Sequence, residues 1–488
     1  MSGVLVGPSL PLPKNESRSI ILRRPVFNLS RLSAQRLLAL LFIVALAFAV
    51  RSLTGNFLRA HFDDPGWFQS GSYSVFDRQA QNILDHKTRP FWIDDSSRTD
   101  QIIYPPGYPL WMAAIYAVTG YRSPVAVQSV QLVLDSLAVL LLVGIGASAC
   151  RWSVGVAAGV LGALSPLLAL AGATPNADAP ANWVVLGAVW LFLLAAKRQT
   201  IKHAIAAGAL LGLACWLRVN PLLMFVAWTI ALLLFVKASW RRKLGLSAAV
   251  ALATLLVIAP VVVRNLTVFY PQVAPTGLGI GWNLWAGIGE TGRGAEFGAP
   301  CCDEQVIEQD RRAMGLPAEA PIELFWPDGI RRDRERGQKA LAVIKAHPVW
   351  YAGTMARRVW GHVKFAGAPA PHVGSAGFNV TSRKCLPPEH QGGVLGLSVN
   401  ALGMIQSVWR YLALPLIVCG LCLSFRADWR ATGLLLATVA YYVATLAVGH
   451  SEIRYGLPMQ ALLVLLAAVA VCWLGTVATR VGFRKRNS

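Results

Sequence analysis

Long apolar stretches separated by short polar connections dominate this chain. A helix needs about twenty largely apolar residues to cross the hydrocarbon core of a membrane. About ten stretches meet or approach that length, at residues 37–54, 123–149, 153–172, 182–196, 203–217, 221–236, 245–263, 402–425, 431–449 and 457–479. The stretch 105–120 is also apolar, but it opens with Pro-Pro-Gly and is predicted to be an interfacial helix. The pattern therefore predicts an all-α polytopic membrane protein with about ten transmembrane helices.

Composition agrees with that pattern and excludes several other classes of protein. Hydrophobic residues make up 55% of the 488 residues and charged residues 14%, whereas soluble domains carry about 25% charged residues. A disordered chain, a secreted disulfide scaffold and an ordinary soluble enzyme are thereby excluded. The net charge of +21 could indicate nucleic-acid binding. Because the basic residues lie largely between apolar stretches, we expect membrane lipids and no nucleic acid as partners.

The distribution of Lys and Arg predicts the orientation, since cytoplasmic connections are enriched in them. The basic connections fall on one side of the predicted bundle together with both termini, while the short turns on the other side hold only Arg218 and Arg454. Both termini are therefore expected in the cytoplasm. The predicted parts are a cytoplasmic tail (1–36), a membrane domain (37–264) containing a first outer loop (55–122), a large outer loop (265–401), C-terminal membrane helices (402–479) and a basic cytoplasmic tail (480–488).

The first outer loop is rich in acids directly after the first apolar stretch. Its aspartates include Asp63, Asp64, Asp77, Asp94, Asp95 and Asp100. A carboxylate beside the lipid boundary is well placed to accept a proton from an acceptor hydroxyl. The alternative is that these residues are solvated loop acids that cap helices and form turns.

Polar residues within or at the ends of apolar stretches form a second group of candidates, because they are costly there and often functional. Asp135 lies in the middle of a stretch, where a structural hydrogen bond between helices is the favoured interpretation. Arg218 and Arg264 stand at outer ends, and guanidinium groups there could hold a lipid-linked phosphate or simply reach lipid headgroups. The turn GHSEIRYGLP adds four residues at the outer face: His450, Glu452, Arg454 and Tyr455.

Several well-known motifs are absent from the sequence. It contains no nucleotide-binding Gly-rich loop, no HExxH and no Cys/His cluster. Energy must then come from an ion gradient or from an activated substrate delivered through the membrane. Cys302 (or Cys301) and Cys385 lie in the same outer loop and could form a disulfide in an oxidising compartment, or remain free thiols.

Six blocks of sequence resemble the polytopic glycosyltransferases of the C superfamily. The similarity is to the bacterial branch related to dolichyl-phosphate-mannose protein mannosyltransferases and aminoarabinose transferases. The blocks are FDRQAQNIL after the acidic loop, YPPGYPLWMAAIYAVTG, GLACWLRVNPLL, PVVVRNLTVFYPQVAPTGLGIGWNLWAGIG, AVIKAHPVWYAGTMARRVW and HSEIRYGLPMQALLVLLAA. They follow one another in order over most of the chain.

This resemblance implies a function and a site. It implies a membrane enzyme, expected in a bacterial inner membrane, that transfers a sugar from a polyprenyl-phosphate carrier to a glycan, lipid or protein acceptor at the outer face. An Asp of the first outer loop would then act as general base. Arginines of the outer turns would hold the donor phosphate (Arg218, Arg264 and Arg454), beside a substrate pocket formed by His450, Glu452 and Tyr455.

The catalytic acid departs from the family pattern. Ser72 and Tyr73 stand where the family has its acidic pair. Asp63 and Asp64 are the favoured bases because they follow the first apolar stretch directly, and Asp77 is a close rival. A divalent metal could bind among so many acids, although no spacing of ligands requires one.

Two other functions compete with the transferase. A flippase or transporter for lipid-linked glycans would also explain the apolar stretches and the polar residues within them. The absence of internal repeats and the size of the second outer loop argue against it. A non-catalytic assembly protein derived from the same fold is the third alternative.

Overall fold

A computed structural model describes residues 33–59, 62–63, 72–363, 392–450 and 452–486. The regular structure of these residues is helical, and their only β-type pairing is one isolated bridge between Glu323 and Trp326. The helices of the membrane bundle are α2 (Ala34–Arg59), α5 (Pro124–Ala149), α6 (Trp152–Leu164), α7 (Pro166–Ala173), α8 (Asp178–Arg198), α9 (Ile201–Leu217), α10 (Met224–Phe235), α11 (Trp240–Val268), α16 (Gly393–Val448) and α17 (Leu457–Arg486).

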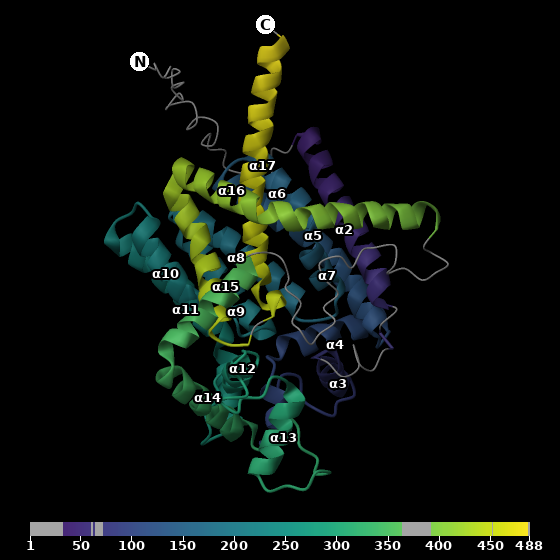
Figure 1. The fold of residues 1–488 in the computed structure, drawn as a ribbon, viewed down its shortest axis with the longest axis vertical. Coiled ribbons are helices and arrows are strands. Elements are labelled where there is room, and N and C mark those ends of the chain that lie inside the picture. Colours follow the sequence, from purple (N-terminus) through teal and green to yellow (C-terminus); the bar gives the residue numbers. More distant parts are fainter. Residues whose placement is uncertain (1–32, 60–61, 64–71, 364–391, 451, 487–488) are drawn as a thin grey trace, which may run out of the picture.

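A second set of helices gathers at one end of this bundle. They are α3 (Ser72–Leu84), η3 (Thr99–Ile102), α4 (Gly107–Thr119), α12 (Ile280–Gly289), α13 (Asp303–Ala313), α14 (Gly329–Ala346), α15 (Pro348–Val363) and η6 (Ile453–Gly456). Figure 1 shows α3, α4 and α12–α14 at the end opposite to the one where α17 terminates, with α15 leading back to the bundle. These segments belong to the two predicted outer loops and to the turn before α17.

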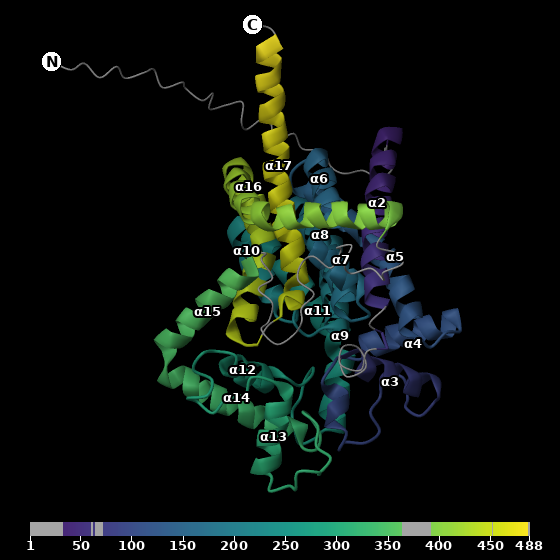
Figure 2. The same ribbon diagram turned by 45° about the vertical axis from the view of Figure 1, so that its right-hand side comes forward.

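Six described helices are long and apolar enough to cross a membrane, or seven when a bent pair is counted as one span. The chain is accordingly an integral membrane protein, but the predicted count of ten spans is not confirmed. Three other apolar helices within the described residues, Ile201–Leu217, Met224–Phe235 and Gly393–Ile405, are shorter. The N-terminal part of α16 also lies crosswise to α2 and α17 (Figures 1 and 2). Apolar length alone does not distinguish such helices from spanning ones.

Local sequence explains where several helices start and bend. Ser123 caps α5 by accepting a hydrogen bond from the N–H of Ala126. Ser165 caps α7 in the same way, and Pro166 follows it. Because Pro lacks an N–H and cannot continue the preceding helix, α6 and α7 meet at a 60° bend. The predicted span 153–172 is thus a bent pair.

The two outer segments contact each other at the end of the bundle. Thr99 of the first segment donates a hydrogen bond to the carbonyl of Phe325 and accepts one from the N–H of Gly329, at 3.1 Å. The N–H of Leu278 donates to the carbonyl of Ile102 at 3.1 Å. Segments distant in sequence therefore form one unit, which we call the outer unit after its predicted location.

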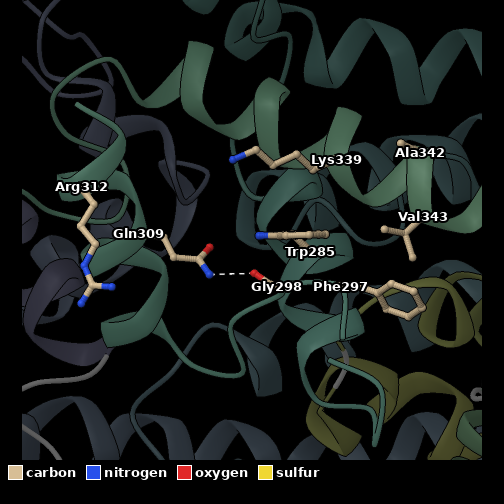
Figure 3. Close-up of a pocket in the computed structure, with 8 residues that line it drawn as sticks. All are labelled: Trp285, Phe297, Gly298, Gln309, Arg312, Lys339, Ala342 and Val343. Carbon is tan, nitrogen blue, oxygen red and sulfur yellow. Dashed lines mark hydrogen bonds between the residues drawn. The ribbon is translucent and has the colours of Figure 1, made fainter. Parts of the chain in front are cut away.

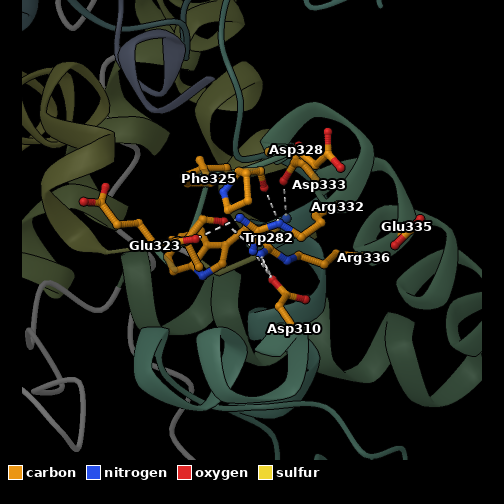
Figure 4. Close-up of polar contacts among 12 residues, drawn as sticks. Trp282, Asp310, Glu323, Phe325, Asp328, Arg332, Asp333, Glu335 and Arg336 are labelled. Carbon is orange, nitrogen blue, oxygen red and sulfur yellow. Dashed lines mark hydrogen bonds and ion pairs between the residues drawn. The ribbon is translucent and has the colours of Figure 1, made fainter. Parts of the chain in front are cut away.

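Helix α14 organises the second outer segment through buried charges (Figure 4). Asp333 accepts hydrogen bonds from the N–H groups of Gly279, Gly281 and Trp282 at 3.2, 3.3 and 2.8 Å, and so satisfies the start of α12. Arg332 and Arg336, one turn apart, both contact the carboxylate of Asp310 on α13. This network holds α12 and α13 against α14.

Candidate functional site

The start of α8, the end of α9 and the turn before α17 bring two arginines to one carboxylate. Asp178 is the first residue of α8, and Arg218 is the residue that ends α9. Arg218 Nε lies 2.8 Å from Asp178 Oδ1, and Arg454 Nε lies 3.8 Å from Asp178 Oδ2. Arg218 also donates to Asn176 Oδ1 at 3.0 Å. Asp178 is 6% exposed and Arg218 13%. In the trio of Asp178, Arg218 and Arg454, the first two side chains are mostly buried, whereas Arg454 is 34% exposed and also contacts Glu452.

The turn before α17 continues the network. Arg454 pairs with Glu452, with an Nε–Oε2 distance of 2.7 Å. Tyr455 donates to Glu452 Oε1 at 3.3 Å. His450 lies between two carboxylates, with Nδ1 2.5 Å from Glu290 Oε1 and Nε2 3.9 Å from Glu452 Oε1. The structure therefore places His450, Glu452, Arg454 and Tyr455 together with Arg218.

Aromatic rings lie beside both arginines. The guanidinium carbon of Arg218 lies 5.8 Å from the centre of the Tyr104 ring and 5.7 Å from that of Tyr455. Arg454 lies 5.5 Å from the Tyr455 ring. Phe76 of α3 contacts Tyr104, with ring centres 4.7 Å apart. Cation–π contacts of this kind keep a guanidinium in place while leaving its N–H groups available to a ligand.

The charges around His450 alter two pKa values. Burial lowers the pKa of His450, but hydrogen bonds and charges from Glu290 and Glu452 outweigh it and raise the pKa to about 9. Burial raises the pKa of Glu452, but His450 and Arg454 outweigh it and lower the pKa to about 2. Near neutral pH the turn therefore holds a protonated histidine and an ionised glutamate.

We expect the stability of the protein to depend on pH through His450. Its pKa rises on folding from 6.5 to about 9, so its contribution is complete below about pH 6.5 and is lost as the pH rises through 9. The contribution of Glu452 is complete above its ordinary pKa of 4.5 and is lost as the pH falls through 2. The wild-type melting temperature in detergent should fall between pH 7 and 10 by more than that of Glu290→Gln. Glu296→Gln, which removes a more exposed carboxylate, serves as the control. Equal losses in wild type and Glu290→Gln would contradict the expectation.

Helices α12 and α15 fix the position of the turn. The N–H of His450 donates to the carbonyl of Asn283 at 2.6 Å. Arg358 of α15 donates to the carbonyl of Ala447 at 3.1 Å and to that of Gly287 at 2.5 Å. A Cβ atom on Gly287 would lie 2.4 Å from the backbone nitrogen of His450. The close approach of α12 to this turn therefore requires glycine at 287.

Gly287→Ala should therefore displace the turn and weaken the site. We expect at least about a tenfold loss of activity with a modest loss of stability, because the backbone atoms that the new Cβ would meet cannot rotate away. Gly353→Ala on α15 is the matched control, since its nearest atom would lie 3.9 Å from the added Cβ. Activity and melting temperature of both variants provide the test. Wild-type behaviour of Gly287→Ala would contradict the geometry.

The three candidate bases differ in their surroundings. Asp77 accepts hydrogen bonds from Tyr116 at 2.6 Å and from Gln81 at 2.8 Å, so both of its oxygens are engaged. Burial, followed by the hydrogen bond to Asp77, raises the pKa of Tyr116. Asp63 is exposed just beyond the end of α2. Asp64 lies outside the described residues.

Arg264 lies apart from the other two predicted phosphate-binding arginines. It is 3% exposed, and it donates to Asn265 Oδ1 at 2.7 and 2.9 Å and to the carbonyl of Phe91 at 2.9 Å. Its guanidinium carbon lies 5.1 Å from the Phe91 ring. These contacts join α11 to the first outer segment, so Arg264 is engaged away from the trio of Asp178, Arg218 and Arg454.

Sequence reasoning missed Asp178 and Glu290. Asp178 lies in a short turn between two predicted spans, and Glu290 directly follows the block GWNLWAGIG. An acid at the outer end of a predicted span was the available signal for Asp178. Nothing in the sequence indicated that Glu290 would reach His450.

Neither a metal-binding cluster nor a disulfide occurs in the part of the chain that the structure covers. No group of three His, Cys, Asp or Glu side chains there could hold a metal ion. Cys301 and Cys302 are free thiols. The predicted disulfide partner, Cys385, lies outside the described residues.

This chain is similar to one protein family in sequence and to oligosaccharyltransferases in fold. Residues 104–263 match the model of the dolichyl-phosphate-mannose-protein mannosyltransferase family. The apo crystal structure of the Archaeoglobus fulgidus oligosaccharyltransferase shares 14% identity, with a TM-score of 0.51 over 92% of this chain and 51% of that one. The archaeal oligosaccharyltransferase AglB from Archaeoglobus fulgidus, in complex with an inhibitory peptide and a dolichol-phosphate, shares 12% identity, with a TM-score of 0.50 over 93% and 52%.

The chain spans about half the length of these oligosaccharyltransferases. At such low identity the likeness concerns the fold alone. No curated protein matches the sequence. The family match and the shared fold together confirm a resemblance to membrane glycosyltransferases of this kind, while the bacterial branch stays a prediction.

Proposed function

We propose that this protein transfers a sugar from a polyprenyl-phosphate-linked donor to a glycan, lipid or protein acceptor at the outer face of the membrane. The match of residues 104–263 to the mannosyltransferase family supports this proposal, as does the dolichol-phosphate in the complex of the structurally similar oligosaccharyltransferase. The observation that carries it is the convergence of Arg218 and Arg454 on Asp178. This convergence places two guanidinium groups where apolar helices end.

The two arginines suit a departing phosphate. A polyprenyl-phosphate sugar is a phosphodiester with one negative charge, and the leaving polyprenyl phosphate gains a second one. Cations beside it therefore bind the transition state more strongly than the ground state, which is the condition for catalysis. The planar guanidinium group of Arg218 can donate two parallel hydrogen bonds to phosphate oxygens.

We place the base in the first outer segment. The acceptor hydroxyl gives its proton to Asp63 or Asp64 while its oxygen bonds to the anomeric carbon. The bond from that carbon to the phosphate oxygen breaks at the same time, and the configuration is inverted. Because both oxygens of Asp77 are already engaged, we assign Asp77 to positioning α3 against α4.

The proposed orientation rests on the distribution of basic residues and on the positions of the first and last helices. Basic connections predict that both termini lie in the cytoplasm. The start of α2 and the end of α17 lie at the end of the bundle opposite to α12–α14, which is consistent with an outer site. A bacterial inner membrane is the expected location.

Asn substitutions distinguish the acids. Purified protein in lipid vesicles would be supplied with polyprenyl-phosphate monosaccharides, and release of polyprenyl phosphate would be followed. We expect Asp63→Asn or Asp64→Asn to lower release about a hundredfold, the typical effect of losing a general base, without a change in melting temperature. Asp77→Asn should lower stability and activity together, while Asp94→Asn, at an exposed acid, is the control. Loss of activity confined to Asp77→Asn would contradict the assignment.

A further inference from the structure

A hollow in the outer unit lies between α12, α13 and α14 (Figure 3). Its volume is about 610 Å³, within the range of about 300–1,000 Å³ typical of small-molecule sites. The side chains that line it are those of Trp285, Phe297, Gln309, Arg312, Lys339 and Val343. These residues lie apart from the trio of Asp178, Arg218 and Arg454, and the proposed transfer chemistry uses none of them.

Trp285 presents an unpartnered donor to this hollow. The residue is 6% exposed and belongs to a cluster of buried apolar side chains that includes Ile288 and Tyr351. Its ring nitrogen faces the part of the hollow where Gln309 lies (Figure 3). Within the described residues, that nitrogen makes no hydrogen bond to the protein. The body of the side chain is buried while its N–H reaches the hollow, so this group can donate a hydrogen bond to a ligand there.

Gln309 adds an acceptor beside that donor. Its amide nitrogen donates to the carbonyl of Gly298 at 2.8 Å, which fixes the orientation of the side chain and leaves its oxygen facing the hollow (Figure 3). A donor and an acceptor next to the apolar side chains of Phe297 and Val343 match a sugar ring, which has hydroxyl groups on its rim and C–H groups on its faces.

The charged side chains that line the hollow, Arg312 and Lys339, are both basic. Glu308, the acid beside it, is already paired with Arg311 at 2.5 Å and Arg312 at 2.9 Å. Lys339 projects over Trp285 (Figure 3) and has no ion pair within the part of the chain that is described. A ligand that carries a carboxylate or phosphate would be attracted to Lys339 and Arg312.

We propose that this hollow binds an acidic oligosaccharide, as the charged part of a glycan or glycolipid acceptor. The proposal rests on the proposed sugar transfer and narrows the class of acceptor. The acid group contacts Lys339 and Arg312, a hydroxyl group accepts from the indole N–H of Trp285, and another donates to Gln309. The trio of Asp178, Arg218 and Arg454 remains the place of the phosphate donor.

Calorimetric titration of the full chain in lipid nanodiscs tests this binding directly, without a donor. The probe is trigalacturonate, and its methyl ester is the neutral control. We expect trigalacturonate to bind and the ester not to bind. Lys339→Gln and Arg312→Gln should each weaken binding about tenfold, the effect of losing one charge-assisted hydrogen bond, and rising salt should weaken it too. Trp285→Phe should weaken it while retaining the ring.

Arg331→Gln, at an exposed arginine of α14, is the matched control and should bind as the wild type does. Equal binding of the ester, equal weakening by Arg331→Gln, or no binding would overturn the proposal. Tighter binding of a tetraglutamate peptide than of trigalacturonate would overturn it in favour of an acidic polypeptide. Both cationic side chains are exposed, so the variants should fold. Because the donor is absent from this experiment, a failure to bind trigalacturonate leaves sugar transfer intact. Conversely, a lack of donor turnover by wild-type protein would contradict sugar transfer without affecting this binding.

Discussion

Replacing Arg218 by Gln is expected to reduce release of polyprenyl phosphate about a thousandfold, the upper range for removing one donor to a developing negative charge. Arg218 lies 2.8 Å from Asp178 and its guanidinium group is held between two tyrosine rings. The substitution removes a preorganised guanidinium group whose paired N–H donors Gln cannot replace. Arg218→Lys should recover only part of the activity, because an ammonium group keeps the charge but not the paired hydrogen bonds. Initial rates in lipid vesicles provide the measurement.

A second substitution separates this effect from misfolding. Arg218→Gln leaves the buried carboxylate of Asp178 with Arg454 alone, at 3.8 Å, so some stability will also be lost. The double variant Arg218→Gln with Asp178→Asn removes that unpaired charge. It should regain melting temperature without regaining activity. Recovery of activity in the double variant would show that Arg218 serves folding rather than transfer.

Breaking the ion pair between Arg51 and Asp135 is expected to destabilise the protein by about 3–5 kcal/mol, the usual result when one partner of a buried pair is removed. The side chains are 1% and 6% exposed. Asp135 also accepts a hydrogen bond from Trp183, and Arg51 donates to the carbonyl of Ala163 at 3.3 Å. The pair thus joins α2, α5, α6 and α8 in the interior of the bundle.

The control for this pair replaces both partners. Asp135→Ala should lower the unfolding free energy strongly, while Arg51→Met with Asp135→Leu should be close to neutral, because apolar side chains of similar size need no compensation for lost solvation. Unfolding in detergent measures both variants. Each folded molecule should retain wild-type transfer activity. Normal stability with lost activity in Asp135→Ala would instead make Asp135 a functional acid.

Apolar stretches predicted the helices well, because each stretch falls largely within an apolar helix or bent pair, although 402–425 and 431–449 share α16. They did not predict the geometry of those helices. The stretch 402–425 falls in α16, whose N-terminal part lies across the bundle, and its hydropathy resembles that of a spanning helix. The bend at Pro166 was visible in the sequence as a proline, but the 60° angle depends on packing. The hydrogen bond between helices predicted for Asp135 is confirmed, although its partner Arg51 could not be identified from sequence.

Some residues of the candidate site could be predicted from the sequence, and others could not. Arg218 and the turn from His450 to Tyr455 could be found because polar residues at the ends of apolar helices are costly. Arg264 satisfied the same criterion but lies against Phe91, because the end of α11 packs on the first outer segment. Asp178 and Glu290 meet their partners only through tertiary contacts between segments distant in sequence. No local pattern specifies such contacts.

The most direct test of sugar transfer follows donor and acceptor together. Purified protein in lipid vesicles would receive a radiolabelled polyprenyl-phosphate monosaccharide and an extract of envelope glycolipids, and both free polyprenyl phosphate and labelled acceptor would be measured. We predict that the two products appear in equal amounts with wild-type protein and disappear together with Arg218→Gln. Movement of the intact labelled donor across the membrane without release of polyprenyl phosphate would contradict sugar transfer and favour a flippase.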